Sequence, residues 1–252
     1  MIQMTNKPEQ GAEAKTAPGF FSFENLSSLA VLVTLLFAFR WSVLSPYHVP
    51  TSSMEPTIHV GDRLLANKLA YNLRVPFTDF VLLSWNTVKR GDIIIFRFPK
   101  DTSLDYVKRV VGVAGDKIRL MDDVLYVNGE AQKREDKETE RAILDGISDS
   151  KEFKRLYQET LGGLDHWVIN NIPSRRSPYQ SNWPEEGFYT VPENSVFVMG
   201  DNRDNSLDSR AWNEVPLSYV KGQAMFVMWS MVFPKDSWIP HFQFHRFFSW
   251  LK

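Results

Sequence analysis

One long apolar run, Leu26–Leu44, constrains this chain more than any other feature of its sequence. In a helix, such a run extends about 28 Å at 1.5 Å per residue, which is close to the thickness of a bilayer core. Arg40 is its one charged residue and lies near its end, where a long basic side chain can reach the membrane interface. Trp41 and Tyr47 belong to the residue types enriched at that interface. The run therefore predicts a single transmembrane anchor.

The same run has two other interpretations, a buried core helix and a cleaved signal peptide. A secretory signal ends in a small-x-small cleavage site, and the segment Ser45–His48, which contains a proline and a tyrosine, is a poor match. Lys7 and Lys15 precede the run, and this weak basic bias favours an N-terminus on the cytoplasmic side. We therefore interpret the run as an uncleaved anchor.

Composition excludes several classes of function. The chain has 252 residues with 29 basic and 30 acidic side chains, so it lacks the basic surplus that nucleic-acid binding usually needs. It contains no cysteine, which excludes disulfides, thiolate metal sites and a cysteine nucleophile. The C-terminal segment Trp238–Trp250 is aromatic but too short to span a bilayer, so packing on the core and lying at a membrane interface both stay open.

After the apolar run, the pattern is that of short strands divided by turns. β-rich runs such as Ile93–Phe96 and Tyr106–Val113 are separated by Gly-Asp turns, and Asn128-Gly129 is a hairpin signal. A polar, irregular stretch follows, in which Lys151–Leu161 is a candidate short helix. We therefore predict a mainly β fold. Its predicted parts are a disordered tail (1–25), the transmembrane anchor (26–45), a β core (46–129 and 186–252) and an insertion or cap subdomain (130–185).

Ser53 is a candidate nucleophile. It lies nine residues after Leu44 in a loop bounded by Pro50 and Pro56, which restrict the backbone around it. At about 3.3 Å per residue, Ser53 lies within roughly 30 Å of the end of the apolar run. Chemistry at Ser53 would therefore take place at a membrane surface, on a substrate that is itself bound to the membrane. Taken alone, such a serine is equally an ordinary turn residue.

A nucleophilic serine needs a base, and both histidine and lysine are available. None of the histidines lies in a familiar local catalytic motif; they are His48, His59, His166, His241 and His245. Lys108 differs from the other lysines because it lies in the strand-like run Leu104–Val113, where burial would lower its pKa and leave it neutral. The alternative is a half-buried strand with Lys108 exposed. Ser148–Lys151 also fits a Ser-x-x-Lys pattern, but it lies in the polar stretch and we interpret it as a chance match.

A third segment, Met199–Arg210, follows an apolar strand and is dense in Asp, Asn, Arg and Ser. This composition is typical of a loop held by its own side-chain hydrogen bonds and Asp–Arg pairs. A polar turn and a calcium loop are the alternatives, although the carboxylates lack the Asp-x-Asp-x-Asp-Gly spacing of a calcium loop.

Taken in order, these segments resemble type I signal peptidase, the membrane-anchored Ser–Lys protease family that removes signal peptides. The shared motifs are Ser-Met-x-Pro-Thr from Ser53, Arg-Gly-Asp-Ile from Arg90, Asp-Tyr-x-Lys-Arg from Asp105, and Gly-Asp-Asn-Arg-Asp-Asn-Ser-x-Asp-Ser-Arg from Gly200. The resemblance extends from about residue 40 to residue 230. It implies a signal-peptidase-like β-sheet catalytic core that carries the polar stretch as an insertion.

The resemblance also implies roles for individual residues. Ser53 matches the nucleophile, Lys108 the general base, and Ser206 the serine that hydrogen-bonds and orients the lysine. The oxyanion hole would be formed by the Ser53 backbone N–H and the Thr51 hydroxyl, where close relatives have a serine. The residues that match those bracing the site are Asp201, Arg109, Asp208 and Arg210.

Two shallow pockets for small side chains, at positions −1 and −3 of the signal peptide, are implied as well. The matching residues are Met54, Ile58, Tyr106 and Val107 in the first pocket, and Tyr47, Val49, Asp105 and Val107 in the second. The implied partners are signal peptides of secreted preproteins and membrane lipid, with the secretion machinery as a further candidate and no nucleic acid. No metal or cofactor is implied. The implied location is the bacterial cytoplasmic (inner) membrane, with one span and an extracytoplasmic catalytic domain.

Two other functions share parts of the pattern. A self-cleaving repressor-type protein uses the same Ser–Lys pair, but it would need a DNA-binding domain in place of the apolar run. A catalytically inactive, membrane-anchored β adaptor would be expected to lack the pair, whereas Ser53 and Lys108 are both present. Relatives from Gram-negative bacteria often carry two spans, and this chain has one such run. The sequence therefore predicts a membrane-anchored serine endopeptidase that cleaves after small residues.

Overall fold

The chain divides into two units, Met1–Phe39 and Arg40–Lys252. The computed structural model describes residues 23–75, 78, 80–172, 187–232 and 239–251. Helix α1 (Phe23–Ser42) covers the apolar run as far as Ser42, and its apolar side chains from Leu26 to Phe37 are exposed. Leu44 and Ser45, the last residues of the predicted anchor, lie in strand β1 (Leu44–His48). Within the described part of the chain, no helix combines the length and the apolarity that crossing a membrane requires. The side chains of Arg40 and Trp41, and residues 1–22 of the predicted tail, lie outside the described residues.

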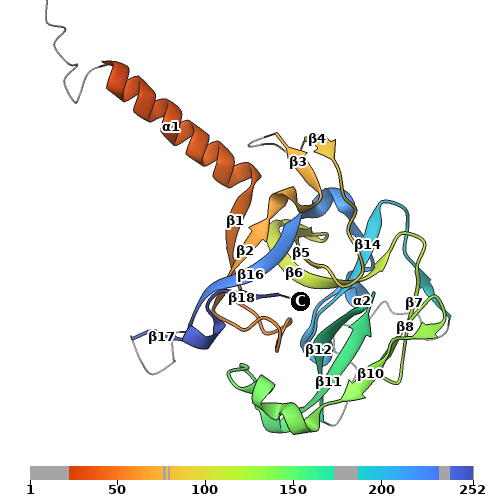
Figure 1. Ribbon diagram of the computed structural model, residues 1–252. Coiled ribbons are helices and arrows are strands. Elements are labelled where there is room, and N and C mark those ends of the chain that lie inside the picture. The colour runs from red at the N-terminus through yellow and green to blue at the C-terminus, as the bar shows by residue number, and fades with distance from the viewer. Residues whose placement is uncertain (1–22, 76–77, 79, 173–186, 233–238, 252) are drawn as a thin grey trace, which may run out of the picture. The chain divides into compact units, whose positions relative to one another are not determined.

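The second unit is mainly β, as predicted, and its centre is an antiparallel sheet (Figure 1). The strand order is β1-β2-β16-β5-β6-β14-β15, and β17 and β18 pair with β16. The strands of this sheet are β1 (Leu44–His48), β2 (Asp62–Asn67), β5 (Ile93–Phe98), β6 (Asp101–Val113), β14 (Ser195–Met199), β15 (Val215–Pro216), β16 (Val220–Val232), β17 (His241–Phe242) and β18 (Ser249–Trp250). Strand β5 from Ile93 to Phe96 and strand β14 from Val196 to Met199 are apolar and buried on both faces, as is typical of central strands.

Three smaller sheets complete the described strands. Their strand orders are β10-β11-β12, β13-β7-β8-β9 and β3-β4. The strands are β3 (Asn72–Arg74), β4 (Val81–Ser84), β7 (Lys117–Met121), β8 (Val124–Val127), β9 (Glu130–Ala131), β10 (Arg134–Asp136), β11 (Lys154–Leu161), β12 (Leu164–Asn171) and β13 (Tyr189–Thr190). The short helices are η1 (Lys68–Ala70), η2 (Glu138–Leu144), η3 (Lys151–Phe153), η4 (Arg203–Asn205), α2 (Ser209–Trp212), η5 (Leu217–Tyr219) and η6 (Phe244–Arg246).

The helix predicted over Lys151–Leu161 is wrong. Only its first three residues are helical, in η3, and the rest is strand β11, which pairs along its whole length with β12. Gly162 and Gly163 join the two strands, and both have positive φ, as a two-residue hairpin turn requires. Lys154, Leu156 and Leu161 are buried, so the stretch forms part of a packed layer and not an irregular surface. Whether 130–185 is a separate subdomain stays a prediction.

Hairpin β5–β6 positions the functional segments. Its register sets Ile94 opposite Lys108 and Ile93 opposite Arg109, and Met199 of β14 lies opposite Arg109 on the other side. Strand β14 therefore delivers the polar segment that follows it to the middle of β6. The β6–β14 ladder begins only at Arg109, so among the described strands the preceding part of β6 pairs with β5 alone.

Candidate active site

Ser53 lies in a tight turn between β1 and β2. The Glu55 N–H donates to Ser52 O at 3.1 Å, and the Ile58 N–H donates to Met54 O at 2.9 Å. Ser53 itself is 7% exposed, and its carbonyl oxygen accepts a hydrogen bond from the Asn202 N–H at 3.1 Å. Hydrogen bonds within the turn and from the 200–210 loop therefore hold the candidate nucleophile.

Lys108 lies against Ser53. Its side chain is 3% exposed, which resolves the choice between a buried and an exposed lysine that the sequence left open. Nζ is 2.6 Å from Ser53 Oγ and donates to Val107 O at 3.0 Å. The two candidate residues are 55 positions apart in the chain, and the sheet brings their reactive atoms within hydrogen-bond distance.

Burial lowers the pKa of Lys108 from 10.5 to about 8. The carboxylates of Asp208 and Asp201 oppose this shift, whereas Arg210 adds to it. The loss of hydration outweighs the attraction of the two carboxylates, because a buried ammonium gives up strong solvation. A substantial fraction of Lys108 is therefore neutral, and able to accept a proton, at mildly alkaline pH.

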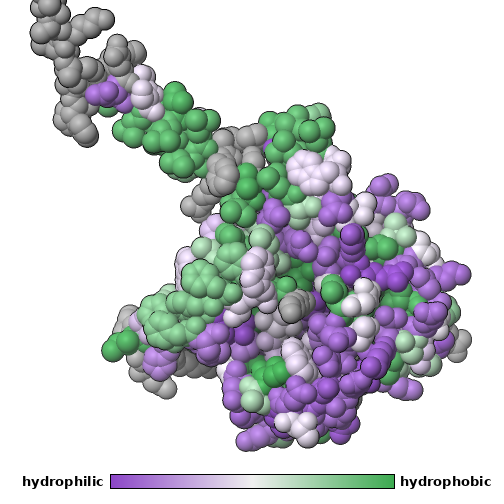
Figure 2. Space-filling view, viewed as in Figure 1, coloured by the Kyte–Doolittle hydropathy of each residue, from purple (hydrophilic) through white to green (hydrophobic). Residues whose placement is uncertain are grey.

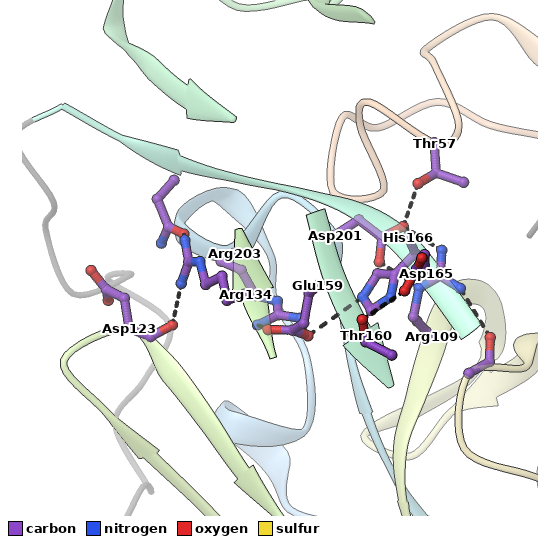
Figure 3. Close-up of polar contacts among 12 residues, drawn as sticks. Thr57, Arg109, Asp123, Arg134, Glu159, Thr160, Asp165, His166, Asp201 and Arg203 are labelled. Atoms are coloured by element: carbon purple, nitrogen blue, oxygen red, sulfur yellow. Dashed lines mark hydrogen bonds and ion pairs between the residues drawn. The ribbon is translucent and has the colours of Figure 1, made fainter. Parts of the chain in front are cut away.

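A buried ion pair supports the lysine strand (Figure 3). Arg109 Nε and Nη2 each donate to a carboxylate oxygen of Asp201 at 2.8 Å, and both side chains are 1% exposed. The Thr57 hydroxyl donates to Asp201 Oδ2 at 2.5 Å. Although burial alone would raise it, the pKa of Asp201 is lowered by Arg109. Asp201 thus joins the β6 strand to the turn that carries Ser53.

A second buried pair holds the 200–210 loop. Arg210 donates to Asp208 from Nε and Nη2, each at 2.8 Å, and Asp208 Oδ2 accepts from the Gly200 N–H at 3.0 Å. A side chain at Gly200 would collide with the Ser206 hydroxyl and with Ser53 O, so only glycine fits. The predicted bracing residues are thus brought together in two bidentate pairs.

The contacts of Ser206 and Thr51 do not test the roles that were predicted for them. Ser206 is buried in this loop, but among the described residues no hydrogen bond joins its hydroxyl to Lys108. Thr51 is exposed and lines the cavity next to Ser53. Their roles as lysine-orienting and oxyanion-binding residues stay predictions.

A cavity of about 380 Å³ opens onto the pair. Of the predicted pocket residues, those that line it are Tyr47, Val49, Asp105, Tyr106 and Val107. Met54 and Ile58 are fully buried in the core cluster that also contains Val49. They therefore support the cavity wall and do not form it. The prediction missed several lining residues, among them Leu104, Asn205 and Leu207, although these three lie within the segments that it singled out.

Of the alternative bases, His48 lines the cavity beside Ser53, whereas two other histidines lie at a different cavity. His59 and His166 are buried, and their rings line a different cavity from the one beside Ser53. Lys151 pairs with Asp145 at 2.6 Å, so Ser148–Lys151 is not a second pair of this kind. Within the described chain, no three His, Asp or Glu side chains gather in the manner of metal ligands.

Comparison with known proteins agrees with the motifs. Residues 22–229 match the protein family described as signal peptidase, peptidase S26. A signal peptidase I from Pseudomonas aeruginosa is 33% identical over 248 residues, which cover 94% of this chain and 83% of that protein. One from Rickettsia typhi is 34% identical over 218 residues, which cover 82% and 80%. A crystal structure of a signal peptidase I from Enterococcus faecalis has a TM-score of 0.33 and 26% identity, and covers 56% of this chain and 98% of that chain.

Proposed function

The chain belongs to the signal peptidase family, peptidase S26, and is a serine peptidase, and we propose that Ser53 and Lys108 are its catalytic residues. In this proposal it cleaves N-terminal signal peptides from secreted preproteins. The observation that carries the proposal is the 2.6 Å approach of Lys108 Nζ to Ser53 Oγ, together with the burial that lowers the pKa of the amine to about 8.

The proposed reaction is acyl transfer. Neutral Lys108 takes the proton of Ser53 Oγ, and the oxygen attacks the carbonyl carbon of the last signal-peptide residue. The protonated lysine then gives its proton to the leaving amine, and water hydrolyses the ester. The Ser53 N–H and the Thr51 hydroxyl would stabilise the oxyanion, and such donors contribute about 3 kcal/mol each.

The substrate would bind in extended form beside β6. The stretch of β6 before Arg109 pairs with one described strand only, and its side chains from Leu104 to Lys108 line the cavity. An added strand would gain main-chain hydrogen bonds there, while the pockets select small side chains. Cleavage would follow small residues at positions −1 and −3.

Substitution at position −1 of a preprotein tests the proposed specificity. When alanine at −1 is replaced by leucine, we expect kcat/KM to fall at least roughly 100-fold, because a shallow pocket has no room for the larger side chain. N-terminal sequencing of the product identifies the cleaved bond. The same leucine placed at +5 is the matched control and should leave the rate unchanged. Equal rates for the two residues at −1 would contradict the specificity.

We also propose that the enzyme is attached to the bacterial cytoplasmic membrane through residues 26–45, with its catalytic unit outside the cytoplasm. Seven apolar side chains of α1 between Leu29 and Phe37 are 41–61% exposed, which is costly in water. Figure 2 shows apolar residues gathered on α1 and again on hairpin β3–β4, where Leu82, Leu83 and Trp85 are 52–63% exposed. The aromatic C-terminal segment, with Phe244 and Trp250 also exposed, offers a further surface suited to lipid.

Membrane attachment is tested by alkaline extraction of membranes from cells that produce the full chain. We expect the protein to stay in the membrane pellet, because an apolar segment of this length is not released by alkali. The triple variant Leu29→Glu, Leu32→Glu, Leu36→Glu should move to the supernatant, since each carboxylate is costly inside the bilayer. Release of the unmodified chain would contradict the attachment.

A further inference from the structure

Glu55 is a buried carboxylate that the proposed mechanism does not use. It lies two residues after Ser53, its side chain is fully buried, and among the described residues no cation pairs with it. Its two oxygens accept hydrogen bonds from Ser148, from the N–H at 2.9 Å and from the hydroxyl at 3.2 Å, and the carboxylate also accepts one from the Val60 N–H. An apolar side chain of similar size would fill this place at lower cost, because burying a carboxylate is expensive. The bonds from Ser148 and Val60 are therefore what a carboxylate gains here, and those from Ser148 are the ones that come from a segment remote in sequence.

The segment that carries Ser148 is also bound to the hairpin formed by β11 and β12. The neighbouring carboxylate, Asp149, pairs with Lys154 Nζ at 3.0 Å, and Lys154 is 3% exposed. Lys154 also donates to Asn171 Oδ1 at 2.7 Å, on the partner strand of its hairpin. Asp149 thus connects the 145–149 segment to the β11–β12 hairpin, and Glu55 connects it to the turn that carries Ser53.

The same segment reaches the nucleophile turn by a second route. Asn205 Nδ2 lies 3.4 Å from Asp149 Oδ2 and 3.0 Å from Ser52 Oγ. The Glu55 N–H donates to Ser52 O at 3.1 Å, so the contacts from Glu55 through Ser148–Asp149 and Asn205 return to Ser52. Along the chain, Ser53 lies between the two residues at which this ring of hydrogen bonds reaches the turn, directly after Ser52 and two residues before Glu55.

We propose that Glu55 is a positioning residue, which through Ser148 makes the 145–149 segment part of the framework that orients Ser53 toward Lys108. This inference rests on the proposed catalytic role of Ser53. Its physical basis is that the ring spans three segments remote in sequence, so that breaking it at Glu55 frees one side of the turn. A shift of about 1 Å in a reacting atom costs on the order of 100-fold in rate.

Two substitutions of Glu55 separate positioning from folding. In Glu55→Met an apolar chain of similar length fills the space, and we expect a stable protein whose kcat falls about 100-fold with KM changed less than about threefold. In Glu55→Gln the amide oxygen still accepts from the Ser148 N–H and the amide nitrogen donates to its hydroxyl, so kcat should stay within about threefold of wild type. Glu152→Ala, at an exposed carboxylate of the same region, is the control and should not change kcat.

Hydrogen exchange of the Ser148 amide measures the contact itself and depends on no reaction. We expect this amide to be protected in wild type and in Glu55→Gln, and to exchange at least about tenfold faster in Glu55→Met. If wild type cleaves no preprotein while the exchange pattern is as expected, the proposed function fails and the contact stands.

Three results would overturn the positioning role. The first is a folded Glu55→Met enzyme with kcat within threefold of wild type. The second is an equal loss in the Gln and Met variants, because the amide keeps the hydrogen bonds. The third is a Glu55→Met chain that does not fold, which would make Glu55 a residue of structure alone.

Discussion

Replacement of Ser53 by alanine is expected to abolish preprotein cleavage while the protein stays folded. The Ser53 hydroxyl has one hydrogen-bond partner among the described residues, Lys108, and that amine keeps its bond to Val107 O when the hydroxyl is removed. Little stability is therefore lost. The rate should fall by roughly 10,000-fold or more, because loss of the nucleophile removes the covalent route entirely.

The matched control for this variant is Ser195→Ala. Ser195 is 7% exposed, the same as Ser53, but it lies at the start of β14 and bonds only weakly to Glu193 O at 3.4 Å. It should keep the wild-type rate, and circular dichroism and thermal unfolding of both variants should match wild type. A Ser53→Ala protein that cleaves at more than a hundredth of the wild-type rate would refute the nucleophile.

Substitution of Lys108 is expected to have an effect of the same size. Lys108→Met keeps the apolar stem and removes the amine, so the rate should fall by roughly 10,000-fold while stability at pH 7 is kept or increased. Lys108→Arg should be equally inactive, because a guanidinium cannot be deprotonated in a protein and so cannot act as the base. Activity in the arginine variant near that of wild type would show that Lys108 serves as a positive charge and not as a base.

The pH dependence of the wild-type enzyme follows from the same amine. The base is the neutral lysine, and its pKa of about 8 means that kcat/KM should rise about tenfold per pH unit below pH 7.5 and level off above pH 8. Lys108 must lose its proton to act as the base, so kcat/KM decreases as pH falls. Initial rates of preprotein cleavage between pH 5.5 and 9.5, with stability checked at each pH, measure the profile. A limb centred near 6.5 would contradict Lys108 as the group whose deprotonation controls the rate.

The sequence was most informative where chemistry and strand pattern coincide. Ser53, Lys108 and the 200–210 loop lie in motifs that can be read locally, and a β period that alternates every two residues predicts the strands that carry them. Asp–Arg pairs within the loop were predicted from its composition, and Asp208 and Arg210 form one, whereas Asp201 pairs with Arg109 of β6, outside the loop.

The remaining features depend on contacts between distant segments. Lys151–Leu161 was predicted as a helix from its own composition. The hairpin turn at Gly162 and Gly163, directly after it, was not recognised. Glu55 and Ser148 are 93 residues apart, and nothing in either local sequence indicates that they meet. Met54 was placed in a pocket by the family resemblance, although its side chain is buried in the core. Burial of this kind follows from the packing of the sheet and not from spacing along the chain.

The measurement that tests the Ser53–Lys108 pair most directly is a side-by-side incubation of purified wild type, Ser53→Ala and Lys108→Met with one preprotein that has alanine at −1 and −3. Cleavage is followed by gel, and each product is sequenced from its N-terminus. We predict that wild type gives one new N-terminus, directly after the alanine at −1, and that neither variant gives it at a detectable rate. The same N-terminus produced by either variant at a rate near that of wild type would contradict the Ser53–Lys108 mechanism.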